Sequence, residues 1–157
     1  RGRPMSEASP SDAIRLDMAR ALAHLGTPPG FTETGPAHAG QHLLTEDDLV
    51  NGVGDVVLAR PSMGASYHLS VVVDDDAQKI THVIRGEDLF TATFIHRLLQ
   101  ALLELPVPTY HHHPLVRDDK GKRLAKRDDA RAIARYRDDG LTPDDIRRLV
   151  ASPSSGP

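Results

Sequence analysis

Cysteine is absent from the 157 residues of the chain, and this absence excludes more chemistry than any other feature of the composition. Disulfides and metal sites with thiolate ligands cannot form without it. A chain without disulfides is compatible with the reducing cytoplasm, which is where we expect this protein. Tryptophan is also absent and aromatic residues make up only 4% of the chain, so we expect a largely aliphatic core.

Long apolar runs and a surplus of positive charge are missing as well. No apolar run reaches the ~20 residues that a membrane-spanning helix needs. The formal net charge of −3 excludes a protein that is basic over its whole surface, but it allows a local basic patch. The length suits one domain, or one domain with a small additional lobe.

The first 54 positions are dominated by polar and loop-forming residues. Residues 27–40 are rich in Thr, Pro and Gly, and this composition is typical of a loop. Residues 13–26 carry apolar side chains at helical spacing and end in a glycine, which predicts a helix. The short run "AIRL" at 13–16 is alternatively a strand.

Two runs rich in β-branched residues follow, "GDVVLAR" at 54–60 and "ASYHLSVVVDD" at 65–75. Pro and Gly in the intervening "PSMG" predict a hairpin. The acidic "DDDAQK" is predicted to be a turn, because it lacks the ligand spacing of a calcium loop. A further run, "ITHVIRG" at 80–86, completes a predicted three-stranded meander or part of a larger sheet.

Apolar residues at helical spacing mark "TATFIHRLLQALLEL" at 91–105. Thr91 or Thr93 is a candidate cap for this helix, and Pro106 is expected to end it. Since "TYHHHPLV" at 109–116 reads as a strand, the segment predicts a right-handed crossover between parallel strands. Two helices, over 130–140 and 141–151, complete a chain of the α/β or α+β class.

Arg85 and Tyr67 are candidate ligand-binding residues. Arg85 ends a predicted strand, and ligands of α/β sheets bind at the carboxyl ends of strands. Its guanidinium could hold a carboxylate through two hydrogen bonds, or it could form an ordinary ion pair with Asp75, Glu87 or Asp88. Tyr67 lies in a predicted strand, where its hydroxyl either orients a polar ligand or stays at the rim of the core.

The three histidines at 111–113 invite a metal interpretation, which the spacing does not support. On a strand, His111 and His113 face one way and His112 faces the other. Two ligands fall short of the three or four that zinc requires. We therefore predict no metal site, and leave open that His112 faces a cleft.

Basic residues concentrate between positions 117 and 135. Eight basic residues stand against four acidic ones, a local surplus of four positive charges in an acidic chain. Such a patch suits a nucleotide polyphosphate whose charge develops during a reaction. The alternative is a solvated charged loop without a ligand.

The order and spacing of these segments resemble the glutamyl-tRNA synthetase family. The resemblance covers residues 12–150 and is dense over 55–127, through "SYHLSVVVDD", "ITHVIRGEDL", "LLQALLELPVPTYHHHPLV" and "GKRLAKR". It implies the α/β, Rossmann-like nucleotide-binding fold of class I synthetases. The chain is most similar to the short members without an anticodon-binding domain, because it has "RGEDL" where full-length glutamyl enzymes more usually have "RGEEH".

The resemblance also implies an activity and its substrates. Enzymes of this kind condense L-glutamate with ATP, and we expect Mg²⁺ to accompany the ATP. The short members transfer the glutamate to the queuosine base in the anticodon of tRNA-Asp. Tyr67 matches the family tyrosine that lines the glutamate pocket, and Arg85 matches the arginine that holds the substrate carboxylate. The alternatives are the charging of tRNA-Glu and a non-catalytic RNA-binding module.

The stretch "RLAKR" matches the signature loop of the family, which binds ATP. The implied ATP-binding residues are Arg123, Leu124, Ala125, Lys126 and Arg127, and Lys126 fits the catalytic lysine that contacts the phosphates. Arg123 replaces a lysine, which keeps the charge but changes a point donor into a planar fork. Ala125 replaces a serine and lacks its hydroxyl.

The first family signature, a His-Ile-Gly-His-like stretch, is absent, and so is the cysteine-rich zinc motif common in the short members. We therefore expect the C-terminal half of such an enzyme, unable by itself to form glutamyl-adenylate. The expected organisation is part of an inserted lobe over 1–54, the second half of the nucleotide-binding domain over 55–127, C-terminal helices over 128–150 and a flexible tail over 151–157.

Overall fold

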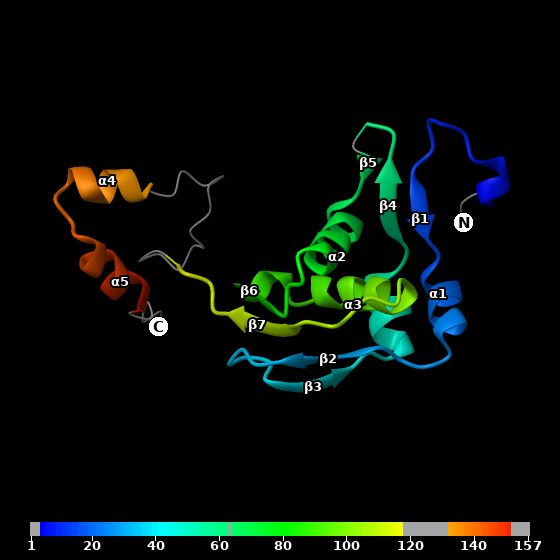
Figure 1. Cartoon of the computed structure of the whole chain (residues 1–157), viewed down its shortest axis with the longest axis horizontal. Coiled ribbons are helices and arrows are strands. Elements are labelled where there is room, and N and C mark those ends of the chain that lie inside the picture. The colour runs from blue at the N-terminus through cyan, green and yellow to red at the C-terminus, as the bar shows by residue number, and fades with distance from the viewer. Residues whose placement is uncertain (1–3, 63, 118–131, 152–157) are drawn as a thin grey trace. The chain divides into compact units, whose positions relative to one another are not determined.

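The computed structural model describes residues 4–62, 64–117 and 132–151 (Figure 1). It consists of two compact units, Arg1–His113 and Pro114–Pro157, which are described separately. The predicted domain boundary at position 127 and the predicted ATP-binding residues 123–127 lie outside the described residues. None of the described helices is long and apolar enough to cross a membrane.

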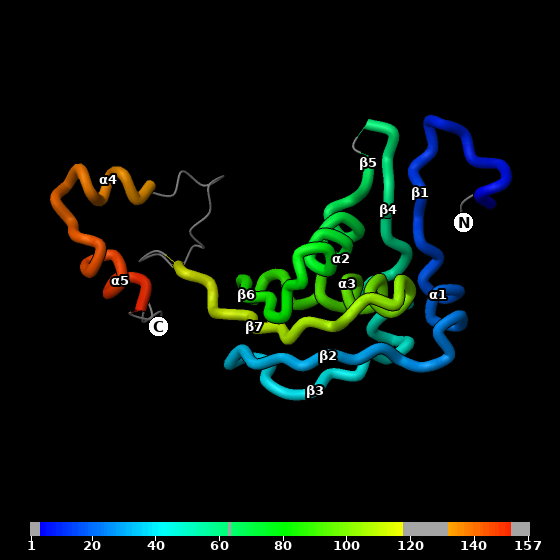
Figure 2. The backbone as a smooth tube through the Cα atoms, viewed as in Figure 1, coloured from blue at the N-terminus to red at the C-terminus, as the bar shows by residue number. Residues whose placement is uncertain are grey.

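A four-stranded sheet forms the centre of the first unit. Its strand order is β3 (Gly40–Leu43), β2 (Gly30–Glu33), β7 (Thr109–His113) and β6 (His82–Gly86). β2 pairs antiparallel with β3, whereas β7 is parallel to both of its neighbours, β2 and β6. Figure 2 shows β2 and β3 running beside β7. Strands β6 and β7 of this sheet were predicted. Strand β2 was not, because residues 27–40 were predicted to be a loop.

The predicted loop is wrong because its apolar and aromatic residues find partners on distant elements. Phe31 on β2 is only 3% exposed. Its ring stacks on His42 of β3 at 4.9 Å and meets Tyr110 of β7 edge-on at 5.5 Å. Gly35, which follows β2, lies so close to β7 that an added Cβ would be 2.2 Å from the carbonyl oxygen of His112. Tertiary packing therefore overrides a local sequence typical of a loop.

The helical crossover between β6 and β7 is confirmed as a connection between parallel strands. β6 leads through a short 3-10 turn (Glu87–Leu89) into α3 (Ala92–Leu102), and β7 follows. In the register of the pair, Arg85 lies opposite His112. Thr91 occupies the N-cap position without a side-chain hydrogen bond, while Thr93 is completely buried.

The predicted meander over 55–86 is wrong: its middle run forms a helix, and its outer runs, β4 (Val56–Arg60) and β6, belong to different sheets. Residues predicted as a strand form α2 (Tyr67–Ala77), so Tyr67 and His68 lie on the first turn of a helix. The Ser66 hydroxyl accepts a hydrogen bond from the Leu69 N–H at 3.4 Å and starts the helix. Val72 is 2% exposed and packs in a cluster with Ile95 and Leu99 of α3. This burial outweighs the small helical penalty of β-branched residues.

A second, three-stranded sheet has the order β1 (Ile14–Leu16), β4 (Val56–Arg60) and β5 (Gly64–Ala65), with antiparallel pairs. The strand alternative for "AIRL" is thus confirmed, and the predicted helix starts later, as α1 (Met18–Leu25). Asp17 caps α1 by accepting the Arg20 N–H, and Gly26 ends it with a φ of 68°.

The remaining elements are short helices. In the first unit these are a 3-10 turn (Met5–Glu7) and a π-helical turn, η2 (Asp47–Val53). The second unit contains α4 (Ile133–Asp138) and α5 (Pro143–Ala151), as predicted. Thr142 and Asp145 cap α5 reciprocally: the Asp145 carboxylate accepts from the Thr142 N–H, and the Thr142 hydroxyl accepts from the Asp145 N–H.

Candidate functional site

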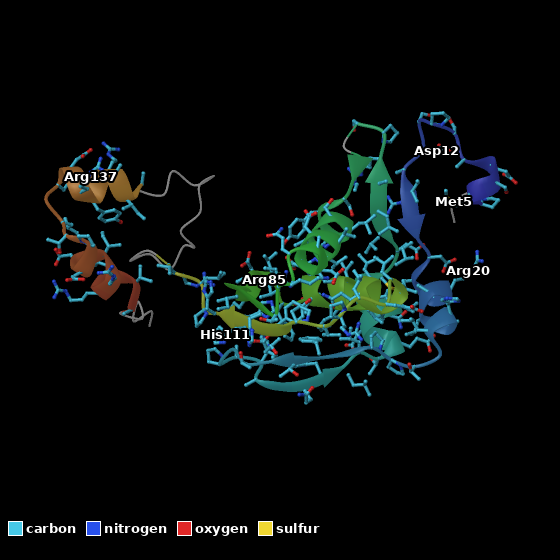
Figure 3. All side chains as sticks on the ribbon, viewed as in Figure 1. Met5, Asp12, Arg20, Arg85, His111 and Arg137 are labelled. Atoms are coloured by element: carbon cyan, nitrogen blue, oxygen red, sulfur yellow. The ribbon has the colours of Figure 1, made fainter. Side chains whose placement is uncertain are left out.

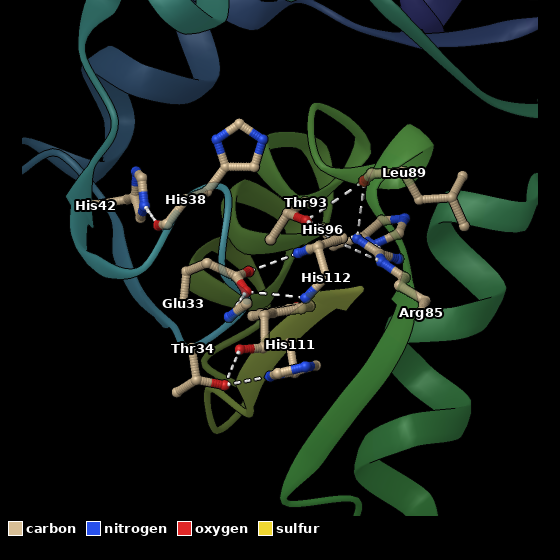
Figure 4. Close-up of polar contacts among 12 residues, drawn as sticks. Glu33, Thr34, His38, His42, Arg85, Leu89, Thr93, His96, His111 and His112 are labelled. Carbon is tan, nitrogen blue, oxygen red and sulfur yellow. Dashed lines mark hydrogen bonds and ion pairs between the residues drawn. The ribbon is translucent and has the colours of Figure 1, made fainter. Parts of the chain in front are cut away.

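Arg85, the next-to-last residue of β6, is the centre of a buried polar network (Figures 3 and 4). Its Nε donates to His112 Nε2 at 3.0 Å, and its Nη1 donates to His96 Nδ1 at 3.2 Å. Its Nη2 donates to Thr93 Oγ1 at 2.6 Å and to the Leu89 carbonyl at 3.2 Å. All four acceptors are neutral groups, so none of these contacts compensates the charge of the guanidinium.

The hydrogen bond from Arg85 fixes the tautomer of His112. Because His112 accepts at Nε2, its own proton lies on Nδ1, which donates to Glu33 Oε2 at 2.5 Å. Both side chains are fully buried. Burial acts to raise the pKa of Glu33, but hydrogen bonds from His112 and from the Gly35 N–H lower it overall. Glu33 is therefore the buried negative charge of the network, one imidazole away from Arg85.

The same argument fixes a second pair of histidines. His96 accepts from Arg85 at Nδ1, so its proton lies on Nε2 and is donated to His68 Nδ1 at 3.0 Å. Burial, followed by the charges of Arg85, His68 and His112, lowers the pKa of His96 to about 3. Burial and the charge of Arg85 also lower the pKa of His68. Both imidazoles are neutral at pH 7.

Tyr67 and His68 face a pocket of about 360 Å³ between α2 and the second sheet. The pocket is lined by Val56, Val57, Ala59, Arg60, Gly64, Ser66, Tyr67 and His68. Tyr67 is 54% exposed, so it is not a core tyrosine. Its ring lies 5.6 Å from the ring of His68 and 5.7 Å from that of His96, measured between centroids. The hydrogen bonds through His96 thus connect this pocket with Arg85.

Two interpretations of Arg85 were open, the binding of a ligand carboxylate and an ordinary ion pair with a nearby acidic residue. Among the described residues, the hydrogen bonds of Arg85 go to neutral acceptors rather than to Asp75 or Glu87. Asp75 acts on Arg85 at longer range: burial raises the pKa of Asp75, and the positive charge of Arg85 opposes that rise. A guanidinium held in this way by neutral groups is suited to an anionic ligand.

Glu33, Thr93, His96 and His68 were missed as site residues by sequence reasoning. Only His112 had been considered, as a residue that could face a cleft, and it is 1% exposed and points into the network. Alternation along β7 was the one usable signal. The described residues contain no group of three His, Asp or Glu side chains arranged to hold a metal ion.

Comparisons with known proteins agree with this architecture. Residues 40–152 match the family model for the catalytic domain of class I tRNA synthetases (E and Q). Over 151 residues the chain is 60% identical to the glutamyl-Q tRNA(Asp) synthetase of Rhodobacter capsulatus, a match that covers 96% of this chain and 53% of that relative. Identity to the glutamate–tRNA ligase of Prochlorococcus marinus strain MIT 9312 is 41% over 103 residues, covering 62% of this chain and 22% of the ligase.

A solved structure shows the same relationship. The glutamate–tRNA synthetase of Elizabethkingia anophelis is 27% identical, with a TM-score of 0.51 over 70% of this chain and 23% of that protein. The chain thus spans about half the length of the R. capsulatus relative and less of the others. The predicted α/β fold of class I synthetases is confirmed. Because the family model matches most of its residues, the chain belongs to the class I tRNA synthetases (E and Q) and carries part of their catalytic domain.

Proposed function

We propose that the protein containing this chain activates L-glutamate with ATP and transfers it to the queuosine base in the anticodon of tRNA-Asp, in the cytoplasm. The observation that carries this proposal is the 60% identity, over 151 residues, to a glutamyl-Q tRNA(Asp) synthetase. The glutamate–tRNA ligase of P. marinus is 41% identical over a shorter stretch of 103 residues. The identity therefore favours modification of tRNA-Asp over charging of tRNA-Glu.

Tyr67 and Arg85 are the proposed glutamate-binding residues of this chain. Tyr67 lines the 360 Å³ pocket. Arg85 supplies a positive charge whose hydrogen-bond partners, in the part of the chain that the structure describes, are all neutral. Arg85 is not among the described lining residues of the pocket, but His96 joins it by hydrogen bonds to the lining residue His68, which neighbours Tyr67 on the first turn of α2. A carboxylate bound here would gain an opposite charge and a donor hydroxyl.

Lys126 and its neighbours Arg123, Leu124, Ala125 and Arg127 remain the proposed ATP-binding residues. Lys126 would place an ammonium on the phosphates as pyrophosphate leaves, when negative charge builds up on the leaving group. Mg²⁺ would arrive with ATP, as part of the nucleotide substrate. The support for this assignment is the sequence "GKRLAKR" together with the family match over residues 40–152.

The decisive experiment measures transfer of radiolabelled glutamate by the full-length protein to three purified RNAs. We expect transfer to tRNA-Asp that carries queuosine and none to tRNA-Asp with guanosine at the same position, which is the matched control. Transfer to tRNA-Glu instead would contradict the proposal in favour of ordinary charging. Binding of RNA without glutamate-dependent ATP–pyrophosphate exchange would contradict any synthetase activity.

A further inference from the structure

We propose that His68 is a further substrate-binding residue, whose Nε2–H donates a hydrogen bond to the carboxylate of the bound amino acid. This inference rests on the proposed function, because it takes glutamate as the ligand of the pocket. It adds to Tyr67 and Arg85 a residue that sequence reasoning did not assign. Its basis is the chain of hydrogen bonds Arg85–His96–His68.

The protonation state of His68 follows from that chain without free choices. An arginine can only donate, so Nδ1 of His96 is an acceptor and carries no proton. A neutral imidazole has one N–H, so the proton of His96 is on Nε2 and points to His68 Nδ1, 3.0 Å away. His68 in turn accepts at Nδ1 and must carry its proton on Nε2. Arg85 thus determines which nitrogen of His68 can donate.

The surroundings of that N–H favour an anionic acceptor. Among the described residues, no hydrogen bond is made by His68 Nε2, although His68 lines the pocket. The other polar side chains of the described lining are Tyr67, Ser66 and Arg60, and none of these described lining residues is acidic. Hydroxyl, imidazole and guanidinium groups together form a donor-rich surface that matches a carboxylate or a phosphate.

The count of donors on Arg85 explains why a second donor is needed. A guanidinium has five N–H groups, and four of them are used by His112, His96, Thr93 and the Leu89 carbonyl. Counting the contacts with described residues, one N–H of Nη1 remains, so Arg85 cannot hold a carboxylate through two hydrogen bonds without giving up a protein contact. His68, placed by the same arginine, supplies the additional donor.

A pair of matched substitutions in the full-length protein tests the assignment. In His68→Asn, the amide oxygen can replace Nδ1 and accept from His96, but nothing replaces Nε2. In His68→Gln, the amide nitrogen can replace the Nε2–H donor. We expect His68→Asn to raise the KM for glutamate by about 10-fold or more in ATP–pyrophosphate exchange, as for the loss of a hydrogen bond to a charged group, and to leave the KM for ATP unchanged. His68→Gln should keep most of the glutamate affinity.

The outcomes separate this inference from the proposed function. An unchanged KM for glutamate in His68→Asn would overturn the inference. An increase in the KM for ATP alone would also overturn it, because the Nε2–H of His68 would then bind a phosphate. If the wild-type protein does not activate glutamate, the proposed function fails. In that case ¹⁵N NMR of the histidine side chains still tests the role of His68. We expect His68 to be neutral with its proton on Nε2, and we expect its signal to shift on addition of glutamate. A charged or Nδ1–H His68, or no shift, would refute the assignment.

Discussion

At the scale of single residues, one arginine sets the protonation of three histidines. Arg85 donates to His112 and His96 and so determines their tautomers. His96 donates to His68 and thereby determines the tautomer of His68. All three histidines have a lowered pKa, with burial as the largest cause and the charge of Arg85 as a further one. The network consequently holds one cation, one buried carboxylate at Glu33 and neutral imidazoles between and beside them.

The neutral state of His96 predicts a pH-dependent stability. Its pKa is about 3 in the folded protein and 6.5 ordinarily, so only the unfolded chain takes up a proton between these values. Its contribution to stability is complete above pH 6.5 and is lost as the pH falls toward 3, with a slope of about 1.4 kcal/mol per pH unit. Urea unfolding at pH 7, 6 and 5 measures this slope.

His96→Asn provides the comparison for that measurement. The asparagine oxygen can accept from Arg85 in place of Nδ1, and the side chain does not titrate. As the pH falls, we expect the free energy of unfolding of the variant to decrease less steeply than that of the wild type. The difference between the two slopes should be about 1.4 kcal/mol per pH unit, which corresponds to one proton. His68 and His112 contribute in the same direction in both proteins. Parallel curves for the two proteins would show that His96 is protonated in the folded state.

Residue-scale reasoning from the sequence proposed Arg85 and Tyr67 as candidates but did not identify the groups that contact Arg85. Arg85 was recognised because it ends a strand, which is local information. Glu33 is 79 positions away from His112, in a segment that looks like a loop, so no pattern around it indicated the contact. The sequence also does not show which nitrogen of a histidine carries the proton, because the tautomer depends on the hydrogen-bond partners in the folded protein.

At the scale of elements, α2 shows how burial decides between helix and strand. Its sequence is rich in valine, which favours strands, yet Ser66 caps a helix that packs on α3. Periodicity was a better guide for α3, where apolar residues repeat at helical spacing over more than two turns. The strand prediction failed for a run without a clear periodicity, and the helix prediction held for an amphipathic run.

The packing of α3 predicts a large difference between Leu98, inside the helix, and Leu103, directly after it. Leu98 is 0% exposed and lies in a core cluster with Met18, Phe31 and Leu49, from three other elements. Leu98→Ala should reduce the free energy of unfolding by about 2–5 kcal/mol, because it leaves a cavity among fixed neighbours. Chemical denaturation measures the loss.

Leu103→Ala is the matched control for this prediction. Leu103 follows α3 and is 45% exposed, so its truncation removes less buried surface than truncation of Leu98. We expect a loss below about 1 kcal/mol. Equal losses in the two variants would mean that the face of α3 carrying Leu98 is not buried in solution.

At the scale of the whole molecule, the proposed substrates are assigned to different segments of the chain. The Arg85 network and the pocket at Tyr67 lie within Arg1–His113, whereas the proposed ATP-binding residues 123–127 lie outside the described residues. Family resemblance could assign both sets from short motifs. The ATP-binding role of residues 123–127 stays a prediction, because these residues lie outside the described ones. Kinetics can address the division of roles directly.

Lys126→Ala in the full-length protein should lower the rate of glutamate-dependent ATP–pyrophosphate exchange by about 100-fold, as for the loss of one group that stabilises transition-state charge. The KM for glutamate should change little, because the ammonium acts on the phosphates. Lys122→Ala, in the same basic stretch but outside "RLAKR", is the matched control and should have a much smaller effect. Equal losses in the two variants would show that the stretch contributes only its summed charge, and would withdraw the catalytic role from Lys126.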